Sequence, residues 1–203
     1  MRSHMDESLE YVLLLQKQLK EVLQEKRYLH TLGVAYMAAS LAMCYGISHR
    51  KALIAGLLHD CAKEYSDTEL LKKCLELELP VSLYERKVPH LLHGVYGAYL
   101  AQYRYGVSDE EILNAIKYHT IGRPDMSKLE QIVFLADYLE PERRQPAEPS
   151  LDELRTLAFH DMDKATLLVT ENTIRYFKSM EREMDPATED VLSYYRKKTE
   201  EVK

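Results

Sequence analysis

Residues 50–62 read RKALIAGLLHDCA, and this stretch determines the expected fold. Ser48 can cap a helix that begins near Arg50, and the run 52–58 is apolar on every face, which is typical of a helix at the centre of a protein. The run ends in His59 and Asp60. An imidazole and a carboxylate are costly to bury alone, so another group must compensate them. A metal ion is a common group of this kind.

The rest of the chain repeats apolar residues at helical period, and no stretch alternates as a strand does. We predict an all-α fold in a single domain, residues 1–203, of which residues 1–5 resemble a cloning remnant. An exposed loop is expected at 141–150. The expected helices cover about residues 9–23, 26–45, 50–62, 67–79, a segment after Pro89 that carries His93, 109–119 with a capping box from Ser108 and Glu111, 127–137, 151–180 and 188–198.

Composition excludes several classes of protein. The net charge of −6 argues against general affinity for nucleic acid. The three cysteines have no C-x-x-C spacing, which indicates reduced thiols in the cytoplasm, and no apolar run is long enough to span a membrane. We therefore expect a cytoplasmic protein without nucleic-acid or membrane partners. The oligomeric state stays open, a homodimer included.

Imidazoles and carboxylates at the ends of separate expected helices suggest a metal centre. One ion could bind His30, His59, Asp60 and Asp137, and Asp60 could bridge to a second ion held by His93 and His119. A carboxylate has two oxygens and can bridge, whereas an imidazole cannot. Nitrogen and oxygen ligands without thiolate favour iron, manganese or cobalt over structural zinc. Two such ions can clamp a phosphoryl group and activate water.

Other histidines show how weak a single dipeptide is as evidence. A second pair, His160-Asp161, lies in the expected helix 151–180 without a flanking apolar run, so we interpret it as a solvated face. His49 is expected at an exposed helix start. His90 lies one turn before His93, and the residues alone do not decide between these two as the ligand.

Five stretches resemble the bacterial YqeK family of HD-domain metal-dependent phosphohydrolases. They span nearly the whole chain, and the segment from HTIGRPDMS to FLADYLEPER is specific to that family, whereas His-Asp alone is not. The stretches are HTLGVAYMAASLA from His30, AGLLHDCAKEYS from Ala55, LLHGVYGAYLA from Leu91, AIKYHTIGRPDMSKLEQIVFLADYLEPER from Ala115 and ENTIRYF from Glu171.

This resemblance implies an HD-domain helical bundle with a dinuclear site in its core, most naturally iron, and it selects His93 over His90. It also implies symmetrical hydrolysis of dinucleoside tetraphosphates, with diadenosine tetraphosphate giving two ADP. The catalytic residues that the resemblance implies are Asp60, Lys63 and Arg123. Further contacts to substrate phosphate are expected from Arg27 and Arg143. Cys61 stands where the family usually has an aliphatic residue, and we expect it to pack as a small apolar group.

Two other readings remain. One is a nucleotidase or cyclic-nucleotide phosphodiesterase on the same fold, and the other is a nucleotide- or metal-sensing module without turnover. Mononuclear HD nucleotidases need fewer ligands, so His93 and His119 favour the dinuclear enzyme. Fifteen tyrosines could stack on a purine, but no individual one is selected by the sequence.

Overall fold

The apolar run 52–58 lies at the centre of the molecule, as predicted. In the computed structural model, which describes residues 8–201, it belongs to α3 (His49–Leu58), and every side chain from Ala52 to Leu58 is buried. Ser48 caps α3 by accepting a hydrogen bond from the Lys51 amide. Since α3 has no polar face in its second half, neighbouring helices must cover it on all sides.

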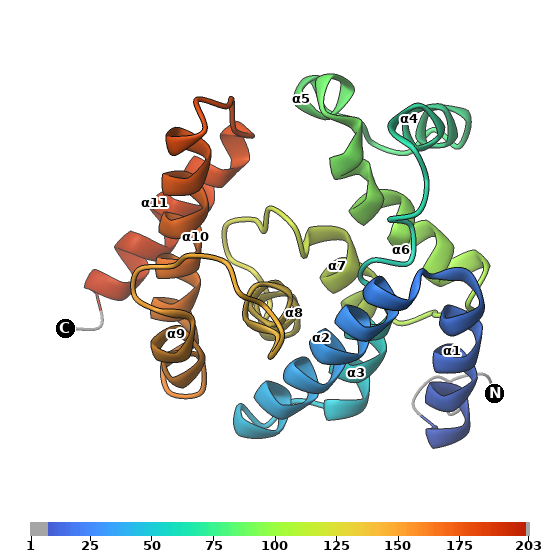
Figure 1. Cartoon of the computed structure of the whole chain (residues 1–203), viewed down its shortest axis with the longest axis horizontal. Helices are drawn as coiled ribbons and strands as arrows, with labels where there is room; N and C mark the ends of the chain where they lie inside the picture. Colours follow the sequence, from blue (N-terminus) through green and yellow to red (C-terminus); the bar gives the residue numbers. More distant parts are fainter. Residues whose placement is uncertain (1–7, 202–203) are drawn as a thin grey trace.

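Three helices provide most of that cover: α2 (Glu25–Cys44), α7 (Glu110–Tyr118) and α8 (Lys128–Leu139). Helix α8 lies between the α2–α3 pair and the C-terminal helices (Figure 1). The described residues contain no strand, so the all-α prediction is confirmed. The remaining elements are α1 (Leu9–Val22), α4 (Asp67–Glu76), α5 (Leu83–Lys87), the 3₁₀ helix η1 (Pro89–Leu92), α6 (His93–Tyr103), α9 (Leu151–Ala158), α10 (Met162–Ser179) and α11 (Pro186–Glu200).

Helices α6 and α7 approach closely because Gly94 has no side chain. A Cβ atom at that position would lie 2.7 Å from the Lys117 carbonyl oxygen, a contact that the two backbones could not relieve without moving apart. This packing brings the start of α6 against the end of α7. It therefore sets the distance between His93 and His119, whose ring centroids are 4.9 Å apart.

Three predictions about helix ends are wrong. Helix α3 ends at Leu58, not near Ala62, because residues 59–65 form turns. The N-cap of α7 is Asp109 and not Ser108, because the Asp109 side chain accepts from the Glu111 and Ile112 amides. The expected helix 151–180 is interrupted before Met162, because the extended Asp161 caps α10 by accepting from the Lys164 amide.

Two further observations complete the comparison with the sequence. The loop after α8 alternates exposed and half-buried residues, as expected. No helix among residues 8–201 is long and apolar enough to cross a membrane. The interpretation of residues 1–5 as a cloning remnant falls outside the described residues.

Candidate metal centre

The predicted ligands come from the ends of helices that pack around α3. His59 follows the last residue of α3, His93 is the first residue of α6, and His119 follows α7. His30 projects from α2 and Asp137 from the last turn of α8. Four of the predicted ligands are buried, namely His59, Asp60, His93 and His119. The fold thus brings together side chains that are up to 107 residues apart in the sequence (137 − 30).

The three buried histidines share one hydrogen-bond pattern. In each of His59, His93 and His119, ring Nδ1 lies against the carbonyl oxygen three residues earlier, at 2.7 Å for His59 and for His119. A carbonyl can only accept, so we assign the proton to Nδ1 in each ring. The Nε2 atoms then carry lone pairs that face the centre of the cluster. This is how metal-binding imidazoles are usually oriented.

His30 is oriented by a carboxylate that the sequence analysis did not select. Its Nδ1 lies 3.3 Å from Oε1 of Glu140, which is buried. Gly33 makes room for this carboxylate, since a Cβ atom there would lie 2.9 Å from Glu140 Oε2. A glutamate just after a helix usually indicates a solvated surface. Only the spacing of Glu140 three residues after Asp137, inside the motif FLADYLEPER, could have pointed to it.

Asp60 lies at the junction of two candidate ligand groups. One group contains His30, His59 and Asp60, and the other contains Asp60, His93 and His119, with the ligand atoms of each group within 4.8 Å of one another. Asp60 Oδ1 is 3.3 Å from His93 Nε2 and 3.6 Å from His119 Nε2, while Oδ2 is 3.8 Å from His59 Nε2. One carboxylate can therefore serve both groups with different oxygens.

Asp137 adjoins the first of these groups. Its Oδ1 is 3.1 Å from His30 Nε2 and 3.8 Å from His59 Nε2. Arg143 donates to the same oxygen at 2.8 Å and also to the Asp137 carbonyl, which holds the carboxylate in place. The structure thus brings all six predicted ligands into one cluster.

The unpaired atoms of this cluster fit a cation. His59 Nε2 and Asp60 Oδ1 are buried without a hydrogen-bond partner. The Nε2 atoms of His93 and His119 lie 3.1 Å apart with their lone pairs converging, and the donors beside them are Lys63 Nζ and Thr120 Oγ1. Buried polar atoms are otherwise nearly always satisfied. A divalent ion in each ligand group would satisfy them.

At His59, His93 and Asp60 the electrostatics favour the protonation states that metal binding requires, whereas at His30 burial lowers the pKa but the hydrogen bond and charge of Asp137 outweigh it and raise that pKa. Burial lowers the pKa of His59 to about 4, and burial together with Lys63 holds the pKa of His93 well below its usual range. Burial alone would raise the pKa of Asp60, but His59, His119 and Lys63 outweigh it and leave this pKa well below its usual range. Neutral imidazoles and an ionised carboxylate are the forms that bind metal.

Two of the predicted cationic residues contact Asp60. Lys63 Nζ is 3.6 Å from Asp60 Oδ1 and 2.9 Å from His93 Nε2, and Arg27 donates to Asp60 Oδ2 at 3.1 Å. The structure does not bring Arg123 to the cluster. Its guanidinium pairs with the buried Glu130 at 2.9 Å and lies over the Tyr118 ring.

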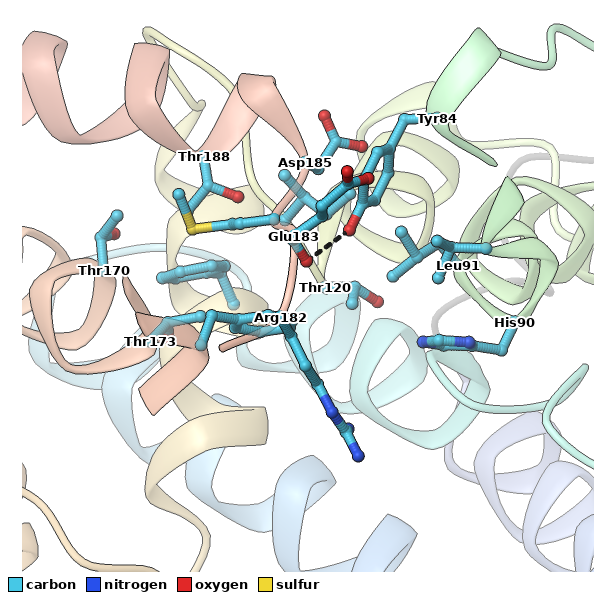
Figure 2. Close-up of a pocket in the computed structure, with 15 residues that line it drawn as sticks. Tyr84, His90, Leu91, Thr120, Thr170, Thr173, Arg182, Glu183, Asp185 and Thr188 are labelled. Atoms are coloured by element: carbon cyan, nitrogen blue, oxygen red, sulfur yellow. Dashed lines mark hydrogen bonds between the residues drawn. The ribbon is translucent and has the colours of Figure 1, made fainter. Parts of the chain in front are cut away.

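A mainly apolar cavity of about 350 Å³ borders the His93 and His119 end of the cluster. The link is Thr120, which lines the cavity and whose Oγ1 is 3.1 Å from His93 Nε2 and 3.0 Å from His119 Nε2. Tyr84 of α5 closes one side by donating to the Glu183 carbonyl at 2.8 Å, and the Arg182 side chain points away from this pair (Figure 2). Phe134 and Phe177 add aromatic walls.

An open groove of about 960 Å³ reaches the other end of the cluster, where it includes His30, Asp60 and Asp137. Its cationic residues are Lys26, Arg27, Lys63, Arg143 and Arg144. The cluster therefore has an apolar cavity at one end and a charged groove at the other. Neither Tyr84 nor Phe177 was singled out by the sequence, because helical periodicity does not show which aromatic residues meet across helices.

The residues that the sequence analysis set aside lie outside the cluster of predicted ligands. His160, Asp161 and His49 are exposed, and Asp161 caps a helix. His90 is also exposed and lines the apolar cavity. Cys61 is buried, its thiol contacts the Gly97 carbonyl, and burial raises its pKa to about 12, so it packs as a neutral group.

Comparison with known proteins agrees with this geometry. The model of the HD domain matches residues 27–142, a span that contains all six clustered residues. The chain belongs to the HD-domain family. Hydrolases of this family are metal-dependent, and the groups formed around Asp60 are suited to that role.

Within the HD-domain family, the chain is similar to proteins named symmetrical bis(5′-nucleosyl)-tetraphosphatase. The one from Bacillus subtilis is 40% identical over 83% of this chain and 89% of the relative, and the one from Staphylococcus aureus is 36% identical over 91% and 94%. A crystal structure from Clostridium acetobutylicum, described as a predicted HD superfamily hydrolase involved in NAD metabolism, has a TM-score of 0.86 and 38% identity, covering 91% of this chain and 96% of that one. The resemblance to the YqeK family is thus confirmed.

Glu140→Ala is expected to weaken metal binding by about 10- to 100-fold, the usual cost of removing a partner behind a metal-binding histidine. Glu140→Gln should restore most of the affinity, since its amide oxygen can still accept from His30 Nδ1. Competition with a chelator measures both variants. Glu142→Ala is the matched control, because Glu142 lies in the same segment but is exposed. Wild-type affinity in Glu140→Ala would contradict the orienting role.

Proposed function

We propose that the chain hydrolyses dinucleoside tetraphosphates symmetrically, converting diadenosine tetraphosphate and water into two ADP. The observation that carries the proposal is a pair of candidate ligand groups that share Asp60, with an apolar cavity at one end and a cationic groove at the other. A dinucleoside polyphosphate needs both environments, one for a base and one for phosphates. The names of the relatives from Bacillus subtilis and Staphylococcus aureus support the same substrate class.

The proposed cofactors are two divalent transition-metal ions, with iron favoured and manganese or cobalt as alternatives. One ion would be held by His30, His59, Asp60 and Asp137. The other would be held by Asp60, His93 and His119. When bound, such ions polarise a phosphoryl group and activate water near neutral pH. Because all ligands are nitrogen or oxygen, the donor set suits these metals better than a structural zinc site.

Lys63 is placed to stabilise negative charge that develops on the phosphates. Its ammonium lies within 3.6 Å of Asp60 Oδ1, at the boundary between the cluster and the groove. Because it points at the shared carboxylate, it can donate to a phosphoryl oxygen bound there and to the departing diphosphate. Arg143 is already held by Asp137, and its remaining N–H groups can bind a second phosphate.

The apolar cavity is the proposed site for one adenosine. Its volume of about 350 Å³ is at the lower end of the range for small-molecule sites, and Tyr84, Phe134 and Phe177 offer rings for a purine. Thr120 joins the cavity to His93 and His119, so a nucleoside bound there would extend its phosphates toward the cluster.

The rival enzyme function is favoured less by this geometry. A nucleotidase acting on AMP would need the cavity but would leave the groove and its five cationic residues without a role. A sensor without turnover would not need Lys63 beside the shared carboxylate. Both rivals are separated from the proposed function by product analysis.

With diadenosine tetraphosphate, we expect ADP as the sole nucleotide product. Symmetrical cleavage follows if the anhydride oxygen that bridges the second and third phosphorus atoms lies over Asp60, with one ADP at each end of the cluster. Chromatography of the products after incubation with iron, manganese or cobalt checks this. AMP plus ATP would mean that the polyphosphate binds in another register. Turnover of AMP or a cyclic nucleotide, with none of the tetraphosphate, would support the rival enzyme.

A further inference from the structure

The two cavities that meet at the cluster have opposite chemical character. The cavity beside Thr120 is enclosed by Tyr84, Phe134 and Phe177. The groove at the other end is lined mainly by charged side chains, and its cationic residues are Lys26, Arg27, Lys63, Arg143 and Arg144. No phenylalanine or tyrosine among the described residues lines this groove. A symmetric dinucleotide would therefore meet two unlike environments.

The guanidinium groups of the groove are fixed in place. Arg27 is held by Glu64 at 2.8 Å and by Asp60 at 3.1 Å, and Arg143 is held by Asp137 at 2.8 Å. A guanidinium has five N–H donors, so each of these arginines keeps donors for a ligand while its position is already set. Lys26 and Arg144 are exposed at the rim. Such a surface recognises phosphate oxygens and offers little to a purine ring.

We propose that the protein recognises only one nucleoside of its substrate and binds the other half through phosphates alone. This inference rests on the proposed function. It adds a second substrate class, the nucleoside 5′-tetraphosphates, which have no second nucleoside. Adenosine 5′-tetraphosphate would place its adenosine in the apolar cavity and its two terminal phosphates in the groove.

The reaction on such a substrate balances with water alone. The oxygen of water forms a bond to the second phosphorus counted from adenosine. The bond from that phosphorus to the oxygen bridging to the third phosphorus breaks, and the electron pair leaves with pyrophosphate. The products are ADP, pyrophosphate and a proton. No other reactant is required.

The test compares the two substrates on the metal-loaded protein. Adenosine 5′-tetraphosphate should give ADP and pyrophosphate with a kcat/KM within about tenfold of that for diadenosine tetraphosphate, since tenfold corresponds to about 1.4 kcal/mol, roughly one modest contact. A loss of a hundredfold or more, with the dinucleotide still cleaved, would show that the second nucleoside has its own site and overturn the inference. Release of AMP would overturn it too. If neither substrate is cleaved, the proposed function fails instead.

A double variant tests the groove itself. Lys26→Ala with Arg144→Ala removes two exposed rim charges that contact no predicted ligand, and should raise KM for both substrates by the same factor, about five- to tenfold if each contributes about 0.5–0.7 kcal/mol. Lys164→Ala with Arg196→Ala removes the same two residue types from exposed positions on α10 and α11 and should change neither value. An increase confined to the dinucleotide would reveal a nucleoside contact in the groove. An unchanged KM for both substrates would mean that the groove does not bind the substrate phosphates. Either result contradicts the inference.

Discussion

Asp60→Ala is expected to abolish turnover, with a loss of about 10³-fold or more, and to remove most of the bound metal. The reason is that Asp60 belongs to both ligand groups, through Oδ1 toward His93 and His119 and through Oδ2 toward His59. Elemental analysis of the wild type, purified without chelator, should show more than one equivalent of transition metal and saturate at two. The variant should hold less than one.

His160→Ala is the matched control for this substitution. It belongs to the other His-Asp pair of the chain, and its side chain is exposed between α9 and α10. Its activity should stay near that of the wild type. Equal losses in two variants that both remain folded by circular dichroism would overturn the location of the site. A wild-type occupancy that stays at one under added iron, manganese or cobalt would count against the second ion.

Lys63→Ala should lower kcat/KM by about 10²–10³, the scale of removing one donor that stabilises the transition state, while metal content is retained. Metal binding should persist because Lys63 is not a predicted ligand. Its positive charge lies near His93 Nε2, so its removal takes away a repulsion toward a bound cation. Steady-state kinetics with metal analysis on the same sample measures both quantities. Loss of metal together with activity would mean that Lys63 acts through the cluster rather than on substrate.

Arg123→Ala provides the contrast to this result. The family resemblance implies a catalytic role for Arg123, but its guanidinium pairs with Glu130, whose side chain is almost fully buried. Removing one partner of such a pair leaves a buried charge uncompensated, so we expect a lower melting temperature with a smaller effect on kcat/KM. A folded Arg123→Ala protein that loses as much activity as Lys63→Ala would instead support the role implied by the resemblance.

Local pattern was sufficient for the fold class and for most helices. Residues 52–58 indicated a central helix, because Ser48 offers a cap before them and an apolar segment without a polar face needs cover on all sides. The pattern did not predict the helix ends at which several side chains can accept hydrogen bonds from the same backbone amides. Asp161 interrupts an apparently continuous helix by capping its second half, and the N-cap of α7 is Asp109 and not the predicted Ser108. Such competition depends on small differences in hydrogen bonding that periodicity does not reveal.

For the site, the sequence by itself determined which residues could bind metal. His59 and Asp60 stand out because they follow the most apolar helix, and the motifs around His30, His93, His119 and Asp137 add the others. Only the tertiary structure decided how these residues are used. Glu140 reaches His30 because Gly33 leaves space, and Arg123 turns to Glu130 instead of the cluster. The apolar cavity and the charged groove likewise exist only after distant helices pack. Residue type and period are local properties of the chain, whereas orientation and cavity shape depend on contacts between elements far apart in sequence.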